Sequence, residues 1–122
     1  MHDVRVLIVD DHEPFRRALS EMVNETAGFR TVACVATAER FLSLIADTPA
    51  DLVLMDINLP GIDGLEATRR LTSVPKHPVV VLLSTFEESE LDFREYGAAN
   101  YCSKAAFGPD RLVQIWSEVG RP

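Results

Sequence analysis

The stretch Val4-Arg5-Val6-Leu7-Ile8-Val9-Asp10-Asp11 carries the first indication of the fold. Apart from Arg5, residues 4–9 are apolar, and such a nearly continuous run is typical of a strand that is covered on both faces of a parallel sheet. Two aspartates end the run, and Pro14 then suits the first turn of a helix. The face expected to be buried on this helix comprises Phe15, Ala18, Leu19, Met22 and Val23.

The alternation of a short apolar run with an amphipathic stretch occurs five times, which is the pattern of an α/β protein. Strands are predicted at residues 4–9, 31–35, 52–55, 79–83 and 100–103. Helices are predicted from residue 14, after the capping residue Thr37, from residue 65, over about residues 88–96, and from Pro109 with Leu112, Val113, Trp116 and Val119 facing inward. We expect a (βα)5 doubly wound parallel five-stranded sheet in the order 2-1-3-4-5, a flavodoxin-like fold.

Length and composition favour one globular domain over residues 1–122. The chain has 122 residues, of which 47% are hydrophobic and 25% charged, and this balance is ordinary for a folded domain. Cys34 and Cys102 form no C-x-x-C pair and lie in apolar stretches. We therefore expect both cysteines to be buried as small hydrophobic residues in a reducing compartment.

The charge balance argues against nucleic acid as a direct partner of this chain. Nineteen acidic residues against 12 basic ones give a net charge of −7, opposite in sign to a surface that binds phosphate backbones. No apolar run approaches the roughly 20 residues of a membrane span, and the start Met1-His2-Asp3-Val4-Arg5 lacks the features of a signal peptide. The sequence therefore predicts a cytoplasmic protein without a membrane segment.

Residues with reactive side chains follow four of the predicted strands. These residues are Asp10 and Asp11, Asp56, Ser84, and Lys104. In the expected strand order the first and third strands are neighbours, only about 5 Å apart, so the three aspartates would crowd together. Like charges at that range repel by about 4 kcal/mol per pair at an effective dielectric near 20, which a bound cation would relieve. Oxygen ligands with open positions for water favour Mg²⁺.

A divalent ion, a lysine and a hydroxyl around one carboxylate form a site for a phosphoryl group. Asp56 is then the predicted nucleophile, which would form an aspartyl phosphate. Mg²⁺ held by Asp11 and Asp56, together with the ammonium of Lys104, would neutralise the phosphoryl oxygens, and the Ser84 hydroxyl would donate to one of them.

These residues, taken in order, resemble a response-regulator receiver domain over essentially the whole chain. The resemblance is carried by Val-Leu-Ile-Val-Asp-Asp at 6–11, Leu-Met-Asp-Ile-Asn-Leu-Pro-Gly-Ile-Asp-Gly at 54–64, the strand over 79–84 that ends in a hydroxyl, and Gly97-Ala98 followed by Tyr101 and Lys104. It implies a phosphoacceptor switch of a two-component system, which takes a phosphoryl group from the phosphohistidine of a sensor histidine kinase onto Asp56. The transfer would be self-catalysed with slow autodephosphorylation, so the domain is regulatory and not an enzyme.

The resemblance also implies roles for individual residues. The direct Mg²⁺ ligands would be Asp11, Asp56 and the backbone carbonyl of Asn58, with Asp10 acting through a metal-bound water. Ser84 and Tyr101 would form the switch pair. The face formed by the fourth helix, fifth strand and fifth helix could serve a homodimer, and receivers of this kind are often joined to a helix-turn-helix domain that regulates transcription.

Two features depart from the family pattern. Ala105 follows the lysine where the family usually has a proline, so the residue that favours a cis turn there is missing. The stretch from Ser84 to Gly97 is about two residues short, which predicts an abbreviated fourth helix or loop and an atypical output geometry.

Other functions remain as alternatives at this stage. A receiver-shaped interaction module that works without phosphorylation is the main one, and a hydrolase with Asp56 as nucleophile would differ by its rapid turnover. A flavodoxin-like nucleotide or flavin site is disfavoured, because the loop after the first strand is acidic and no G-x-G-x-x-G motif occurs. His2, His12 and His77 have no metal-ligand spacing and are expected at the surface or in turns, with His12 close to the site.

Overall fold

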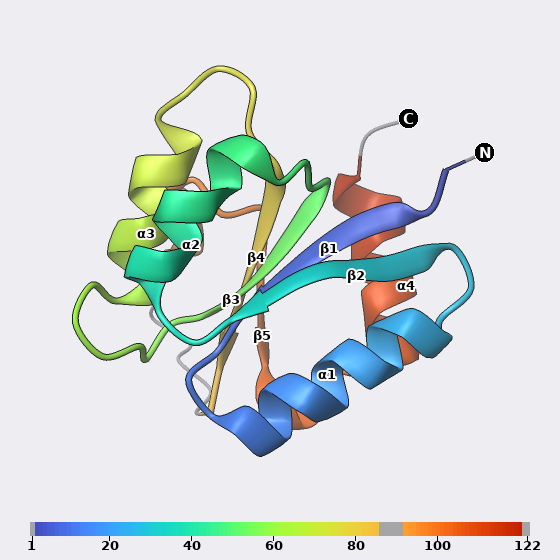
Figure 1. Ribbon diagram of the computed structural model, residues 1–122. Coiled ribbons are helices and arrows are strands. Elements are labelled where there is room, and N and C mark those ends of the chain that lie inside the picture. The colour runs from blue at the N-terminus through green and yellow to red at the C-terminus, as the bar shows by residue number, and fades with distance from the viewer. Residues whose placement is uncertain (1, 86–91, 121–122) are drawn as a thin grey trace.

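The computed structural model describes residues 2–85 and 92–120 and contains one five-stranded parallel sheet (Figure 1). Its strands are β1 (Val4–Val9), β2 (Phe29–Val35), β3 (Leu52–Asp56), β4 (Val79–Ser84) and β5 (Asn100–Ser103). They lie in the order β2-β1-β3-β4-β5, which confirms the predicted topology. Every residue of β3 and β4 is buried, as expected for central strands with continuous apolar runs.

The described residues also form four α-helices and three short 3₁₀ helices, of which η3 and α4 follow the last strand. The α-helices are α1 (Glu13–Glu25), α2 (Ala38–Leu44), α3 (Gly64–Thr72) and α4 (Pro109–Val119), and the 3₁₀ helices are η1 (Ile45–Asp47), η2 (Phe93–Tyr96) and η3 (Lys104–Ala106). The side chain of Thr37 caps α2 by accepting a hydrogen bond from the backbone N–H of Arg40 at 3.1 Å, which confirms the predicted cap.

The helices cover both faces of the sheet, with α2 and α3 on one side and α1 and α4 on the other (Figure 1). Side chains of β1 alternate between these two layers, because successive residues of a strand point to opposite faces. Leu7 and Val9 pack towards α2 and α3, whereas Val6 and Ile8 pack towards α1 and α4. Burial of each such aliphatic side chain contributes about 1.5–3 kcal/mol to folding. This double layer holds the carboxyl ends of the strands at one edge of the molecule.

The connection between β4 and β5 differs from the prediction of a helix over about residues 88–96. The described part of this connection contains only η2, and residues 88–91 of the predicted helix lie outside the described residues. Gly97, with φ of 90°, ends η2 in the left-handed conformation, and its backbone N–H returns to the carbonyl of Arg94. Gly97 therefore limits the helix on its carboxyl side.

Several predictions of burial were wrong. Cys34 is exposed, because β2 is an edge strand whose outer face is incompletely covered, whereas Cys102 in β5 is buried as predicted. Val113 is 47% exposed, and Ile115 is buried in its place. On a helix Ile115 lies three residues after Leu112 and shares its face, while Val113 is rotated by about 100° away from it. Ala18 is also exposed on α1.

The segment Lys104–Ala106 forms η3, and the backbone N–H of Ala106 donates to Oγ of Ser103 at 3.3 Å. No cis peptide bond occurs in residues 2–85 and 92–120, in agreement with alanine in place of proline at position 105. Within the same described ranges, every helix is too short or too polar to cross a lipid bilayer.

Candidate functional site

Three carboxylates meet at the carboxyl ends of β1 and β3. Asp10 and Asp11 directly follow β1, and Asp56 is the last residue of β3. Each offers an oxygen atom, and these three atoms lie within 4.8 Å of one another. The pairing of β1 with β3, in register from Val6 to Val9, brings the two strand ends together. The predicted crowding of the aspartates is therefore confirmed.

The three aspartates differ in their exposure to solvent. Asp10 is 1% and Asp56 is 3% exposed, whereas Asp11 is exposed. A buried carboxylate needs a compensating charge or hydrogen bonds, because transfer of an ion out of water is costly. The site consequently contains two buried acidic groups that require partners and one that faces solvent.

Lys104, which follows the edge strand β5, supplies the compensating positive charge. Its Nζ atom lies 2.7 Å from Oδ2 of Asp10 and 3.4 Å from Oδ2 of Asp56, and 15% of its side chain is exposed. The lysine begins η3 directly after the edge strand β5, so its side chain reaches past the end of β4 to the aspartates. The structure therefore brings Lys104 and the acidic cluster together.

Backbone N–H groups hold the orientation of the two buried carboxylates. Oδ1 of Asp10 accepts from the N–H of His12 at 2.8 Å, and Oδ1 of Asp56 accepts from the N–H of Asn58 at 3.0 Å. Each carboxylate therefore bonds to the backbone two residues ahead, as aspartates in turns commonly do. Oδ2 of Asp10 is buried and accepts no hydrogen bond from the described residues, so the ammonium of Lys104 meets it as an ion pair.

The environment changes the pKa of both Asp56 and Lys104. Burial raises the pKa of the Asp56 carboxyl, and the charge of Asp10 adds to the rise, while the N–H of Asn58 and the charge of Lys104 oppose it. Burial also acts against the charged form of Lys104, but the two carboxylates outweigh this effect and raise the pKa of the ammonium group. The lysine thus stays cationic, and its charge favours the ionised form of the Asp56 carboxyl.

The remaining predicted residues lie on β4, on β5 and on the loop after β3. Ser84 is the last residue of β4, is fully buried, and lies opposite Ser103 in the β4–β5 register. Tyr101 in β5 is half-buried and packs against the core layer under α2 and α3. Asn58 is exposed on the loop after β3. All three therefore belong to the strands or loop that bound the carboxylates.

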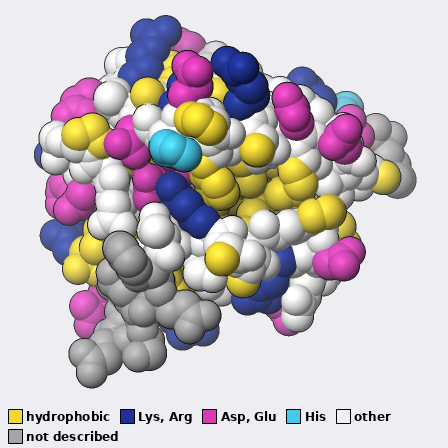
Figure 2. All heavy atoms as spheres, turned by 90° about the horizontal axis from the view of Figure 1, so that it is seen from below, with side chains coloured by type: hydrophobic (Ala, Val, Ile, Leu, Met, Phe, Trp, Pro, Cys, Tyr) yellow, Lys and Arg dark blue, Asp and Glu magenta, His cyan; other side chains and the backbone are white. Residues whose placement is uncertain are grey.

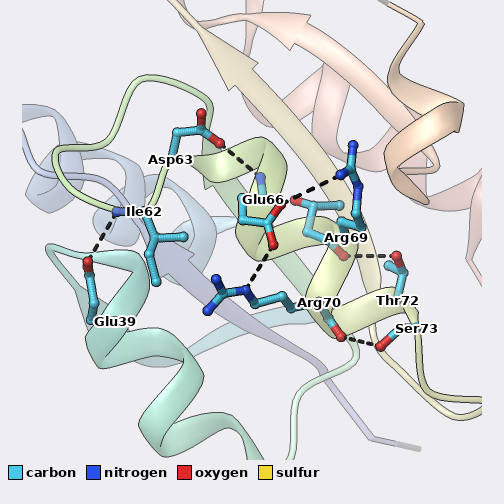
Figure 3. A network of polar contacts seen from close by, with 9 residues as sticks. Glu39, Ile62, Asp63, Glu66, Arg69, Arg70, Thr72 and Ser73 are labelled. Atoms are coloured by element: carbon cyan, nitrogen blue, oxygen red, sulfur yellow. Dashed lines mark hydrogen bonds and ion pairs between the residues drawn. The ribbon is translucent and has the colours of Figure 1, made fainter.

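The loop from β3 to α3, residues 57–63, is held in place at its carboxyl end. Oε2 of Glu39 on α2 accepts from the N–H of Ile62 at 3.1 Å, and Oδ1 of Asp63 caps α3 by accepting from the N–H of Glu66 at 2.8 Å (Figure 3). Gly64 packs directly against the backbone carbonyl of Asp56, and a Cβ atom there would overlap that carbonyl. The start of α3 thus touches the backbone of the central aspartate.

Two residues of α1 contact the site although the sequence did not indicate such a role. Nη1 of Arg16 donates to the backbone carbonyl of Asp10 at 2.6 Å. The ring of Phe15 lies 4.6 Å from Nζ of Lys104, measured to the ring centroid. The helical pattern assigned Phe15 to the core, and nothing in the sequence marks a contact between α1 and a lysine that follows β5.

On the surface, the site lies at the edge where the strands end. Figure 2 views this side of the molecule and shows basic, acidic and histidine side chains next to an apolar area. A hollow beside the cluster is lined by Asp11, Asp63, Leu65 and residues 57–60. A small polar ligand can therefore reach the carboxylates from solvent through the exposed Asp11 side.

Comparison with known proteins agrees with this architecture. The family model described as the response regulator receiver domain matches residues 6–117. The response regulator GacA of Pseudomonas aeruginosa is 36% identical over 118 residues, which cover 95% of this chain and 55% of GacA. The response regulator UvrY of Escherichia coli K12 is 33% identical over 118 residues, covering 95% of this chain and 54% of UvrY. The chain thus spans about half the length of these relatives.

Solved structures show the same fold. The signal receiver domain of the response regulator NarL from Mycobacterium tuberculosis superposes with a TM-score of 0.87 at 24% identity, covering 98% of this chain and 99% of that one. A two-component response regulator of the LuxR family from Aurantimonas sp. SI85-9A1 gives a TM-score of 0.85 at 30% identity, covering 96% and 84%. With the family model matched over most of its length, the chain belongs to the response-regulator receiver domains of two-component systems.

Proposed function

We propose that this receiver accepts a phosphoryl group on Asp56 and acts as a phosphorylation-dependent switch. The observation that carries the proposal is the buried Asp56 carboxylate, which lies beside two further aspartates and 3.4 Å from the ammonium of Lys104. In the proposed transfer an oxygen of Asp56 forms a bond to phosphorus while the P–N bond of a kinase phosphohistidine breaks. The electron pair of that bond stays on the imidazole nitrogen, which is then protonated by water.

The acidic cluster fits a Mg²⁺ ion. Asp10, Asp11 and Asp56 each offer a carboxylate oxygen, and these three oxygens lie within 4.8 Å of one another, a set of hard oxygen donors. We propose that Asp11, Asp56 and the backbone carbonyl of Asn58 hold the ion directly, with Asp10 acting through water. Bound Mg²⁺ would supply positive charge to oxygens on the incoming phosphoryl group.

Lys104 and Ser84 are the proposed contacts of the phosphoryl group apart from the metal ion, and Tyr101 responds to Ser84. Lys104 places a cation next to Asp56 and neutralises negative charge that develops on the phosphoryl oxygens. The Ser84 hydroxyl, at the end of β4, donates a hydrogen bond to one of those oxygens. Tyr101, on the neighbouring strand β5, responds to the movement of Ser84 by turning inward, so a local charge biases a packing arrangement.

The rest of the signalling chain is proposed by analogy with the relatives. We propose a sensor histidine kinase as the phosphoryl donor, a cytoplasmic location, and a single receiver domain over residues 1–122. Phosphotransfer is self-catalysed and autodephosphorylation is slow. The phosphorylated form changes a surface at η2, β5 and α4, which serves a homodimer and controls transcription through a helix-turn-helix domain of a longer protein.

Incubation with acetyl phosphate and Mg²⁺, followed by intact-mass measurement, tests the proposal. The unmodified chain should gain the mass of one phosphoryl group, and Asp56→Asn should gain none. Asp47→Asn, which changes an exposed carboxylate in η1, is the matched control and should be phosphorylated normally. An unchanged mass at saturating donor would contradict the proposal and favour an interaction module that works without phosphorylation.

A further inference from the structure

The ammonium group of Lys104 is enclosed by groups from three different elements. Oδ2 of Asp10 and Oδ2 of Asp56 approach it at 2.7 Å and 3.4 Å from the ends of β1 and β3. The ring of Phe15, from the first turns of α1, lies 4.6 Å away. The ammonium group of Lys104 thus contacts oxygen atoms of two carboxylates and the face of one aromatic ring.

The contact with Phe15 is of a kind that stabilises a cation. The face of an aromatic ring carries negative electrostatic potential and attracts an ammonium group within about 6 Å of its centroid. The attraction is strongest where water is excluded, and only 15% of the Lys104 side chain is exposed. The ring therefore acts on a lysine that is largely shielded from water.

The contact between Lys104 and the Phe15 ring differs from its contacts with the carboxylates, because it can stay unchanged during phosphoryl transfer. A lysine side chain is long and loses considerable rotamer freedom when it is held in one place. During the reaction the ammonium must direct its N–H groups to new oxygens on the phosphoryl group, so its hydrogen bond to Asp56 and its ion pair with Asp10 change. A contact that needs no directional hydrogen bond persists through such a change.

We propose that Phe15 is a positioning residue for Lys104, whose ring keeps the ammonium over Asp56 while its hydrogen-bond partners change from carboxylate to phosphoryl oxygens. This role rests on the proposed phosphoacceptor function. Phe15 touches neither the donor nor Asp56 in this role, and it acts through Lys104. Phe15 is half-buried and packs against the core layer under α1 and α4, which limits the movement of its ring.

A set of substitutions distinguishes the effect of the aromatic ring on Lys104 from the effect of apolar packing at position 15. Phe15→Leu retains an apolar side chain but removes the ring, whereas Phe15→Tyr and Phe15→Trp retain an aromatic face. Met22→Leu, at a half-buried position on the same helix, is the control for altered packing of α1. All variants are made in the full chain, and thermal unfolding shows that each is folded.

The first measurement follows the position of the lysine without any reaction. The chain contains only two lysines, Lys76 and Lys104, so selective lysine labelling gives two sets of side-chain NMR signals. Because an aromatic ring shields nuclei above its face, the Hε protons of Lys104 should resonate upfield of those of Lys76. This shift should persist in Phe15→Tyr and disappear in Phe15→Leu. Equal Hε shifts for the two lysines in the unmodified chain would overturn the proposal.

The second measurement is the rate of mass gain with acetyl phosphate and Mg²⁺. Here an oxygen of Asp56 bonds to phosphorus, and acetate leaves with the electron pair of the broken P–O bond. Phe15→Leu should react about fivefold more slowly, and Phe15→Tyr, Phe15→Trp and Met22→Leu within about twofold of the unmodified chain. A normal rate for Phe15→Leu, or an equally slow rate for Phe15→Tyr, would overturn the positioning role. Failure of the unmodified chain to react would instead contradict the phosphoacceptor function.

Discussion

The Nζ atom of Lys104 lies closer to Asp10, at 2.7 Å, than to Asp56, at 3.4 Å. Both carboxylates are buried, and Oδ2 of Asp10 accepts no hydrogen bond from the described residues. The lysine therefore neutralises Asp10 and still contacts the proposed acceptor. This arrangement ties the stability of the domain to the same charges that the proposed chemistry uses.

Replacement of Lys104 should destabilise the fold. Lys104→Met leaves two buried carboxylates without their cation, and loss of one partner of a buried ion pair costs about 3 kcal/mol or more. Urea unfolding at neutral pH without Mg²⁺ should show this loss, and saturating Mg²⁺ should reduce it. If the loss is as large in an Asp10→Asn background, the two residues are not coupled in the way described.

Removal of Asp11 should abolish the binding of Mg²⁺. Its carboxylate is the exposed member of the cluster of three, so its loss removes a proposed ligand with little effect on the core. Isothermal titration calorimetry with Mg²⁺ should detect binding to the unmodified chain and none to Asp11→Ala. Asp47→Ala, at an exposed position in η1, is the control, and unaltered affinity in Asp11→Ala would remove Asp11 from the ligand set.

Asp56→Asn should stabilise the domain in Mg²⁺-free buffer at neutral pH. Burial raises the pKa of the Asp56 carboxyl, so its ionised form is disfavoured in the folded state. That destabilisation is present above the folded pKa and disappears as the pH falls through it. The difference in unfolding free energy between variant and parent should therefore shrink towards acidic pH. A variant that is less stable than its parent at neutral pH would refute this.

Asp51, which directly precedes β3, should show the opposite pH dependence of the unfolding free energy. Hydrogen bonds from Arg5 hold the pKa of the Asp51 carboxyl below its usual value, with Nη2 of Arg5 at 2.9 Å from Oδ1. The stabilisation is complete above the unfolded pKa, about 3.9 for aspartate, and is lost as the pH falls through the lower folded pKa. Asp51→Asn should be less stable than the parent at pH 7, and the two unfolding free energies should converge in acid. Parallel pH profiles would show that the Arg5 contact contributes nothing.

Gly64→Ala should disturb the backbone of Asp56. The added methyl group would overlap the carbonyl of Asp56, and such overpacking costs about 1–3 kcal/mol. Gly108→Ala is the matched control, because a Cβ atom there meets no heavy atom within 4 Å. Urea unfolding should give a clear loss for position 64 and a change below about 1 kcal/mol for position 108. Similar values at both positions would exclude the close approach as the reason for glycine.

Much of the fold was accessible from local patterns. Continuous apolar runs such as Val79–Leu83 mark buried parallel strands, and Thr37 marks the start of α2 through its capping hydroxyl. The strand order then follows from general rules of handedness and connection, without knowledge of individual contacts. Burial on a single helix face was less accurate, since Val113 is exposed and Ile115 is buried.

The membership of the acidic cluster was also predictable from the sequence, because strand order places the ends of the first and third strands side by side. Asp10, Asp11 and Asp56 lie together for that reason. The sequence could not indicate which carboxylate Lys104 would approach more closely. That choice depends on the path of η3 after β5 and on the distance the lysine side chain spans past β4.

By itself, then, the sequence determined the order of strands and helices and the aspartates that meet at the strand ends, since both follow from periodicity and chain order. Tertiary structure decided the surroundings of each charge: the burial of Asp10, the pairing of Lys104, and the aromatic face of Phe15 beside it. Contacts between residues as far apart in the chain as Phe15 and Lys104 depend on how α1 and η3 pack at the edge of the sheet. No local sequence pattern encodes such packing, because it arises only when the whole core has formed.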